Sequence, residues 1–197
     1  MFPLGSVLFP HMPLGLRVFE ERYLVMLAAV LDADTPEFGV VLIERGQEVG
    51  GGEQRFPHGT RASVGQVSAE ASFVGLVAVG GERFEVVEWL EEEPYPRAIV
   101  KSVPPLFWSE ESGELLDEAE RAVRRSLSLA SEFADGAYPA NVELSDDPLE
   151  RAWQLAGIAP LGELDQMVLL RSGSVRGLLR SVIELVGDAE QTLTWPD

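Results

Sequence analysis

The stretch FPLGSVLFPHMPLGLRVFEERYLVMLAAVL, residues 2–31, decides how the first part of this chain folds. It contains prolines that lack a backbone donor and restrict the residue before them: Pro3, Pro10 and Pro13. Residues 2–12 should therefore form bends or sheet-edge segments and not helix. Residues 14–18 follow without interruption and are predicted to form a strand.

From Glu20 onward the apolar residues recur with a helical period. The side chains that share one helical face are those of Tyr23, Met26, Leu27, Val30 and Leu31. Glu20, Glu21 and Arg22 begin the opposite side. The sequence therefore predicts a strand that leads directly into an amphipathic helix.

The rest of residues 1–105 is predicted to be mostly β-structure. The expected strands cover residues 38–45, 60–67, 72–79, 82–90 and 95–103. Residues 46–59 contain three consecutive glycines and a proline, so they are expected to form a mobile loop. The pair Gly80-Gly81 is expected to form a tight hairpin turn, because glycine tolerates positive φ.

Residues 106–197 are predicted to be mostly helical, and the aromatic pair Phe107-Trp108 is expected to dock the linker onto a core. The predicted helices are a long one from Leu116 that ends at Gly136, one that Asp147 opens and that ends near Gly157, a short one over residues 161–169, and one from Ser174 to Gly187. Asp147, Pro148 and Glu150 have the pattern of a capping box, which makes the second start the clearest.

These elements predict an α+β protein with two parts. Residues 1–105 are expected to form a small, mixed, partly closed β-barrel with one helix, and residues 106–197 a C-terminal helical bundle.

Composition excludes several classes of function. The chain has 33 acidic and 15 basic side chains, for a formal net charge of −18, and such a field repels nucleic acids and anionic membranes. There is no cysteine, so disulfides, thiolate metal sites and cysteine nucleophiles are excluded. No apolar run approaches the roughly 20 residues that span a bilayer, and the N-terminus does not read as a secretory signal. We expect a cytoplasmic protein.

The N-terminal block resembles the substrate-binding domain found at the N-terminus of Lon proteases and in standalone bacterial relatives. The matching segments are Pro3-Leu4, Leu8-Phe9-Pro10, Pro13-Leu14 and the run Val18-Phe19-Glu20-Glu21-Arg22-Tyr23, with weaker collinear matches as far as Leu169-Leu170. The resemblance implies the same two-part layout, with a barrel like that of the PUA fold. Many PUA domains bind RNA, but the charge of this chain argues against that partner.

The sequence offers little for catalysis. It has no G-x-x-x-x-G-K-[ST] phosphate loop, and the single lysine, Lys101, precedes Ser102 on a predicted strand, where adjacent side chains point to opposite faces. His11 and His58 both lie in segments bordered by proline that are predicted to be loops, which favours exposed or turn-packing histidines over a hydrolytic triad. No ligand spacing indicates a metal or another cofactor, and none is expected.

The candidate binding residues are Phe9, His11, Met12 and Leu14, in the proline-rich segment around residues 8–14. Exposed Phe and Met side chains on a bent loop make an adaptable surface for unfolded or extended peptides, and an edge strand could add backbone pairing. The alternative is that Phe9 and Met12 plug the end of the barrel. The sequence leaves both interpretations open.

We therefore expect a non-enzymatic module that binds unfolded or apolar segments of client proteins, or that acts as an adaptor for a separate protease or chaperone machine. One alternative is a small-molecule site built from the tryptophans at positions 89, 108, 153 and 195. A second is an unrecognised hydrolase that uses His11 or His58. The oligomeric state stays open, and a weak homodimer is compatible with the sequence.

Overall fold

The computed structural model describes residues 1–46, 52–131 and 138–194. The chain folds as two compact units, Met1–Pro105 and Leu106–Asp197, which we call the sheet unit and the helical unit. Each is described by itself.

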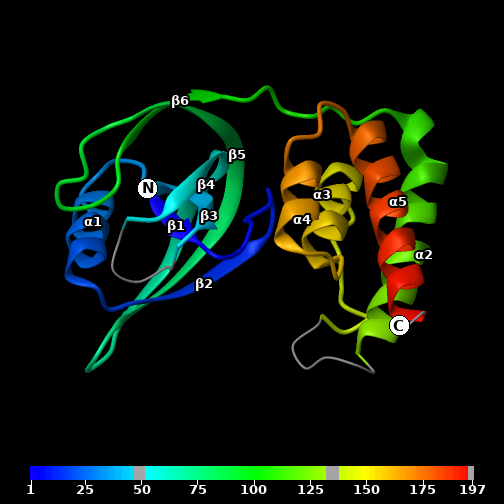
Figure 1. Ribbon diagram of the computed structural model, residues 1–197, viewed down its shortest axis with the longest axis horizontal. Coiled ribbons are helices and arrows are strands. Elements are labelled where there is room, and N and C mark those ends of the chain that lie inside the picture. Colours follow the sequence, from blue (N-terminus) through cyan, green and yellow to red (C-terminus); the bar gives the residue numbers. More distant parts are fainter. Residues whose placement is uncertain (47–51, 132–137, 195–197) are drawn as a thin grey trace. The chain divides into compact units, whose positions relative to one another are not determined.

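The sheet unit is built on one curled, half-barrel sheet (Figure 1). Its strands are β1 (Phe2–Leu4), β2 (Pro13–Val18), β3 (Glu37–Arg45), β4 (Gln54–Ala69), β5 (Val74–Trp89) and β6 (Ala98–Ser102). Their order is β1-β3-β4-β5-β2, and β6 also pairs with β5. Only the β1–β3 pairing is parallel among the described strands. The chain is therefore α+β with a sheet that has β1 at one end and β2 at the other.

The predicted step from strand to helix is present, because β2 ends at Val18 and helix α1 (Glu21–Leu31) follows after two residues. The buried side of α1 carries Tyr23, Met26 and Leu27. The ring of Tyr23 stacks on Phe2 of β1 at 4.2 Å between centroids and 11° between planes. This contact anchors the helix to the short first strand.

The hairpin predicted at Gly80-Gly81 is wrong. Both glycines lie inside β5, and the turn between β4 and β5 is at residues 70–73, where the Glu70 N–H donates to the Phe73 carbonyl at 3.0 Å. The reason is a long-range contact: a Cβ at position 80 would lie 2.1 Å from the carbonyl oxygen of Phe9. Glycine is required here because two backbone segments come into contact, and not because the chain turns.

The loop predicted over residues 46–59 is also wrong in its second half, because β4 begins at Gln54. Pro57 is tolerated inside this strand since the β3–β4 pairing is irregular there, with register shifts on both sides of Ile43. Residues 47–51 lie outside the described part of the chain.

The helical unit contains a short 3₁₀ turn, η1 (Glu110–Ser112), followed by α2 (Gly113–Ala130), α3 (Pro148–Ile158), α4 (Glu163–Leu170) and α5 (Val175–Thr194). Its core is formed by side chains such as Leu116, Val123, Leu127, Trp153, Leu155, Leu169, Leu178 and Val182. The predicted N-cap of α3 is confirmed: the Asp147 carboxylate accepts from the N–H groups of Leu149 and Glu150, each at 2.9 Å. The Glu150 carboxylate instead accepts from the Ser145 hydroxyl, so the reciprocal half of the capping box is replaced.

Two sequence-based predictions for the helical unit are wrong, and a third concerns a residue that the structure does not describe. Helix α5 continues through Gly187 to Thr194, because its apolar stripe reaches the buried Val186 and packing outweighs the helix propensity of one glycine. Phe107 is 79% exposed, and Leu106 is the linker residue that is buried. Gly136, the predicted end of α2, lies outside the described residues.

Tyr23 makes the stability of the sheet unit depend on pH in the alkaline range. Its hydroxyl is buried and makes no hydrogen bond to any described residue. Burial raises the pKa of Tyr23 to about 12 from 10, although the Arg22 guanidinium acts in the opposite direction. Because the folded-state pKa is the higher one, this stabilisation is complete below pH 10 and is lost as the pH rises toward 12. At roughly 1.4 kcal/mol per pKa unit, the loss approaches about 3 kcal/mol.

Urea unfolding measured near the two ends of that pH window would show the loss, and Tyr23→Phe should remove most of it. In an ultraviolet titration of this variant, the tyrosine ionisation that occurs at the highest pH should also be missing. If Tyr23→Phe left the pH dependence unchanged, the assignment to Tyr23 would be wrong.

Candidate functional site

The structure buries the two side chains on which the predicted binding loop depends. Phe9 is 1% exposed and Met12 is 7% exposed, so the expectation that they form an accessible surface is wrong. The prolines do prevent regular secondary structure here, but hydrogen bonds to residues of β4 and β5 hold the segment in place. The His11 N–H donates to the Gly80 carbonyl at 2.8 Å, the Gly80 N–H to the Met12 carbonyl at 2.9 Å, and the Thr60 hydroxyl to the Leu8 carbonyl at 2.6 Å.

The other predicted residues lie at separate places. His11 is exposed at the bend after Phe9-Pro10, with a φ of 61°, and Leu14 is a half-buried residue of β2. His58 lies within β4, opposite Glu85 of β5, and not in a loop as the sequence indicated. Of these residues, only Leu14 belongs to the strand that borders the cavity described next.

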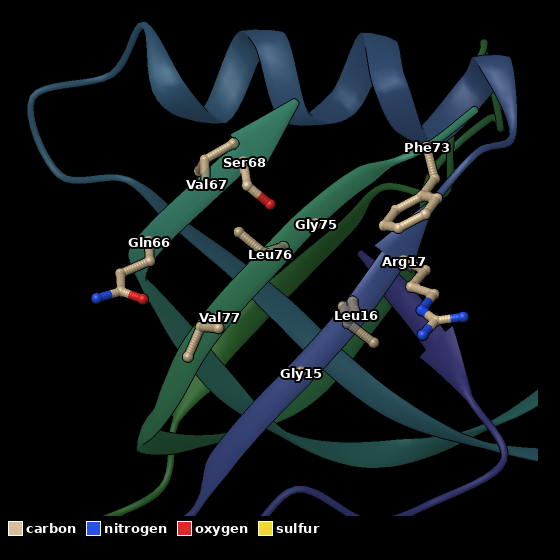
Figure 2. Close-up of a pocket in the computed structure, with 10 residues that line it drawn as sticks. All are labelled: Gly15, Leu16, Arg17, Gln66, Val67, Ser68, Phe73, Gly75, Leu76 and Val77. Carbon is tan, nitrogen blue, oxygen red and sulfur yellow. The ribbon is translucent and has the colours of Figure 1, made fainter. Parts of the chain in front are cut away.

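One cavity of the sheet unit is a groove of about 650 Å³, which we call the outer groove (Figure 2). Strands β2, β4 and β5 and the turn before β5 supply its lining: Gly15, Leu16, Arg17, Gln66, Val67, Ser68, Phe73, Gly75, Leu76 and Val77. Three neighbouring strands thus form one hollowed surface.

The groove exists because β5 is apolar on both faces. Leu76 and Ala78 are buried, whereas Val77 and Val79, which alternate with them, are 45% and 47% exposed. Val67 of β4, which is 42% exposed, borders the groove from the other face of the sheet, because it pairs with the buried Leu76. Unpaired apolar side chains gathered on one sheet surface are typical of a site that binds another molecule.

Glycines leave part of the groove floor without side chains. Gly15 lies directly opposite Val77, and a Cβ at position 15 would meet no atom within 4 Å. Gly75 lies opposite Arg17, with the Ser68 hydroxyl beside it. The backbone of β2 and β5 is therefore accessible between the larger side chains.

Among the described residues, Arg17 is the only charged one that lines the groove. Its guanidinium carbon lies 5.3 Å from the centre of the Phe73 ring, a cation–π contact that covers one side of the ring. In Figure 2, Arg17 and Phe73 lie together at one end, and Val77 and Gln66 lie toward the other. The surface is thus apolar in its middle and polar at its rim.

A second cavity, of about 430 Å³, is lined by Glu44, Glu53, Gln54, Arg55 and Trp89. Arg55 lies over the Trp89 ring at 5.0 Å and pairs with Glu53 at 2.6 Å and with Glu92 at 2.7 Å. One face of this tryptophan is therefore already occupied by Arg55. Trp153 belongs to the core of the helical unit, and Trp195 lies outside the described residues.

Metal and membrane sites find no support in the part of the chain that the structure describes. Within residues 1–46, 52–131 and 138–194, no three His, Cys, Asp or Glu side chains are placed to share an ion. In the same ranges, no helix combines the length and apolar character that crossing a membrane would require.

Sequence reasoning missed Val67, Phe73, Gly75 and Val77. The relevant signal was present, because residues 74–79 are apolar at every position, which is typical of a strand buried on both sides. Only the observed sheet shows that one of those faces has no covering element among the described residues.

Comparison with known proteins gives consistent results. Residues 1–188 match the family model described as the ATP-dependent protease La (LON) substrate-binding domain. Lon protease 2 of Herpetosiphon aurantiacus is 27% identical over 182 residues, which are 90% of this chain and 22% of that protein. The chain thus spans about a fifth of the length of this relative.

Two solved structures share the fold. The crystal structure of a Lon N-terminal domain protein from Xanthomonas campestris has a TM-score of 0.64 and 25% identity, and the match covers 100% of this chain and 96% of that one. The N-terminal domain of the Mycobacterium avium complex Lon protease also has a TM-score of 0.64, at 18% identity, with 94% and 97% covered. This chain belongs to the family of ATP-dependent protease La (Lon) substrate-binding domains.

Proposed function

We propose that this protein recognises extended, apolar segments of protein substrates and binds them in the outer groove. The observation that carries the proposal is the groove itself, where the exposed Val77 stands beside a floor left open by Gly15. A bound segment would cover apolar area that the isolated sheet leaves in water, at roughly 25 cal/mol per Å². The family description, a substrate-binding domain, supports this use of the surface.

The site supports recognition and not catalysis. Its lining consists of glycines, apolar side chains, two polar side chains and one arginine, none of which is placed as a nucleophile with its base. We also propose that this chain acts as an adaptor, which passes captured substrates to a separate protease or chaperone machine. A cytoplasmic location is a further part of the proposal. We also propose that the half-barrel is of the PUA-like type and that the helical unit is a helical bundle. The charge of −18 makes RNA a poor partner.

Val77→Asp tests the groove directly. A carboxylate at this position would have to be buried against an apolar substrate, so binding should weaken at least tenfold, while stability changes little at an exposed strand position. The measurement is a fluorescence anisotropy titration with reduced, carbamidomethylated lysozyme as a permanently unfolded probe, at low and at high salt.

Val87→Asp is the matched control. Val87 is on the same strand, is 63% exposed and does not line the groove, so the same substitution should leave binding unchanged. If both variants bound like the parent protein, or if Val87→Asp alone lost binding, the groove would not be the substrate site.

A further inference from the structure

We propose that a substrate segment binds as an additional β-strand along the outer edge of β2, with alternate side chains in two cavities on either side of that edge. This inference rests on the proposed function, and it adds how the segment binds and which class of segment fits. The favoured substrate is an extended stretch with alternating large and small apolar residues and basic flanks.

The first observation is that β2 ends the sheet. In the strand order β1-β3-β4-β5-β2, no strand among the described residues pairs with the side of β2 that faces away from β5. An unpaired strand edge presents backbone N–H and C=O groups that another extended chain can bind.

The register shows which backbone groups these are. The Gly80 N–H donates to the Met12 carbonyl at 2.9 Å, and the antiparallel pairing then continues from Pro13–Val79 to Val18–Val74. Since hydrogen-bonded positions alternate in an antiparallel ladder, Leu14, Leu16 and Val18 bond toward β5. The backbone groups of Gly15 and Arg17 therefore point to the outer edge. Pro13 has the same phase, and a proline fits there because its missing donor would have faced outward.

The second observation is a cavity of about 150 Å³, the inner pocket, beside the same strand. Its lining is Phe2, Leu4, Gly15, Leu16, Arg17, Val18, Phe19, Glu20 and Tyr23. Phe2, Leu4 and Tyr23 are core residues, so this pocket opens on the core side of β2. It shares Gly15, Leu16 and Arg17 with the outer groove, which means that one short edge borders both cavities.

An added strand would use both cavities at once, because its successive side chains point to opposite faces. Residues that pair with Gly15 and Arg17 direct their side chains to the same face as these two, which is the face of the outer groove. The intervening residues direct theirs toward the inner pocket. The cavity volumes, about 650 Å³ and about 150 Å³, favour large side chains in the first set and small ones in the second.

Charge decides between a substrate segment and a second copy of this chain as the occupant. The sheet unit carries 15 acidic and eight basic side chains, and the whole chain has a net charge of −18, so two copies repel each other. The same field attracts a segment with lysine or arginine at its ends. The occupant we assign is therefore a basic, unfolded segment of another protein.

The test uses a fluorescein-labelled nonapeptide, Lys-Val-Ala-Val-Ala-Val-Ala-Val-Lys, in three forms: unmodified, N-methylated on the valines, and N-methylated on the central alanines. In a strand that adds antiparallel to β2, methylation of the valines removes the donors that face β2, whereas methylation of the alanines removes donors that face solvent. We expect at least tenfold weaker binding for the first methylated peptide and little change for the second. Equal affinities of all three peptides would overturn strand addition.

Two variants at one position repeat the test on the protein. Gly15→Pro removes the outward donor without removing a bond to β5, and Gly15→Ala keeps the donor and places its Cβ in open space. We expect a larger loss of peptide binding for the proline variant than for the alanine variant, because alanine keeps the donor and adds only one methyl group to the groove floor. Should Gly15→Pro fail to fold, the methylated peptides still decide the question with the parent protein.

The outcomes separate this inference from the proposed function. Suppose that Val77→Asp abolishes binding of unfolded lysozyme, but that the unmodified and methylated peptides bind with equal affinity. The groove would then remain the binding site, and strand addition would be refuted. A nonapeptide with glutamate in place of both lysines should bind more weakly at low salt, and equal binding would refute the assigned charge of the segment.

Discussion

Replacing Gly80 by alanine is expected to cost the sheet unit about 3 kcal/mol or more, because the overlap it creates cannot be relieved by a side chain. A Cβ at position 80 would lie 2.1 Å from the carbonyl oxygen of Phe9 and 3.0 Å from its carbonyl carbon. Both are backbone atoms. The segment that carries them is fastened to the same glycine by two hydrogen bonds, from His11 and to Met12.

The measurement is urea unfolding of the full chain, followed by circular dichroism and tryptophan fluorescence. Gly15→Ala is the matched control, since it makes the same chemical change in a strand where no atom lies within 4 Å of the new Cβ. We expect its unfolding midpoint to stay close to that of the parent protein. Equal midpoints for the two alanine variants would show that the Phe9–Gly80 contact is not as described.

Phe9→Ala is expected to have the second large effect, a loss of about 3–5 kcal/mol in the free energy of unfolding, as for other buried aromatic residues. Phe9 is 1% exposed, so truncation leaves a cavity in the core and removes no accessible surface. The folded fraction should therefore bind unfolded lysozyme as the parent protein does.

Phe107→Ala serves as the control for this prediction, because Phe107 is 79% exposed and its removal should change stability by less than about 0.5 kcal/mol. The test compares the free energy of unfolding of Phe9→Ala with its affinity for unfolded lysozyme. A Phe9→Ala variant that remained stable but lost its affinity would mean that the loop around Phe9 is the binding element and that the outer groove is not.

Local signals predicted the parts of the fold that local chemistry determines. Prolines followed by a helical apolar period were enough to predict β2 and α1, and Asp147 with Pro148 was enough to predict the start of α3. In each case the deciding groups lie within a few residues of one another, so a single stretch of sequence contains the whole argument.

The errors arose where distant segments meet. Gly80-Gly81 has the composition of a hairpin turn, yet the carbonyl of Phe9, about seventy positions earlier in the chain, is what requires a glycine there. Phe9 and Met12 sit between prolines and look exposed, but partners on β4 and β5 satisfy the backbone around them and bury both side chains. Periodicity does not encode these partners.

The candidate site was missed for a related reason. Val77 and Val79 alternate with Leu76 and Ala78, and the four residues together predict a strand without showing which face has a cover. Only the sheet order, with β2 at its end, shows that the face with Val77 and Gly15 is open and continues into a free edge.

The most direct test of the account is to map the backbone amide resonances of the ¹⁵N-labelled protein during a titration with reduced, carbamidomethylated lysozyme. We expect the largest shift changes or line broadening at residues 14–18 of β2 and at Phe73 and residues 74–79 of β5, with the region around Phe9 and the helical unit little affected. Changes confined to the helical unit, or to the surface around Val87, would contradict the assignment of the outer groove as the substrate-binding site.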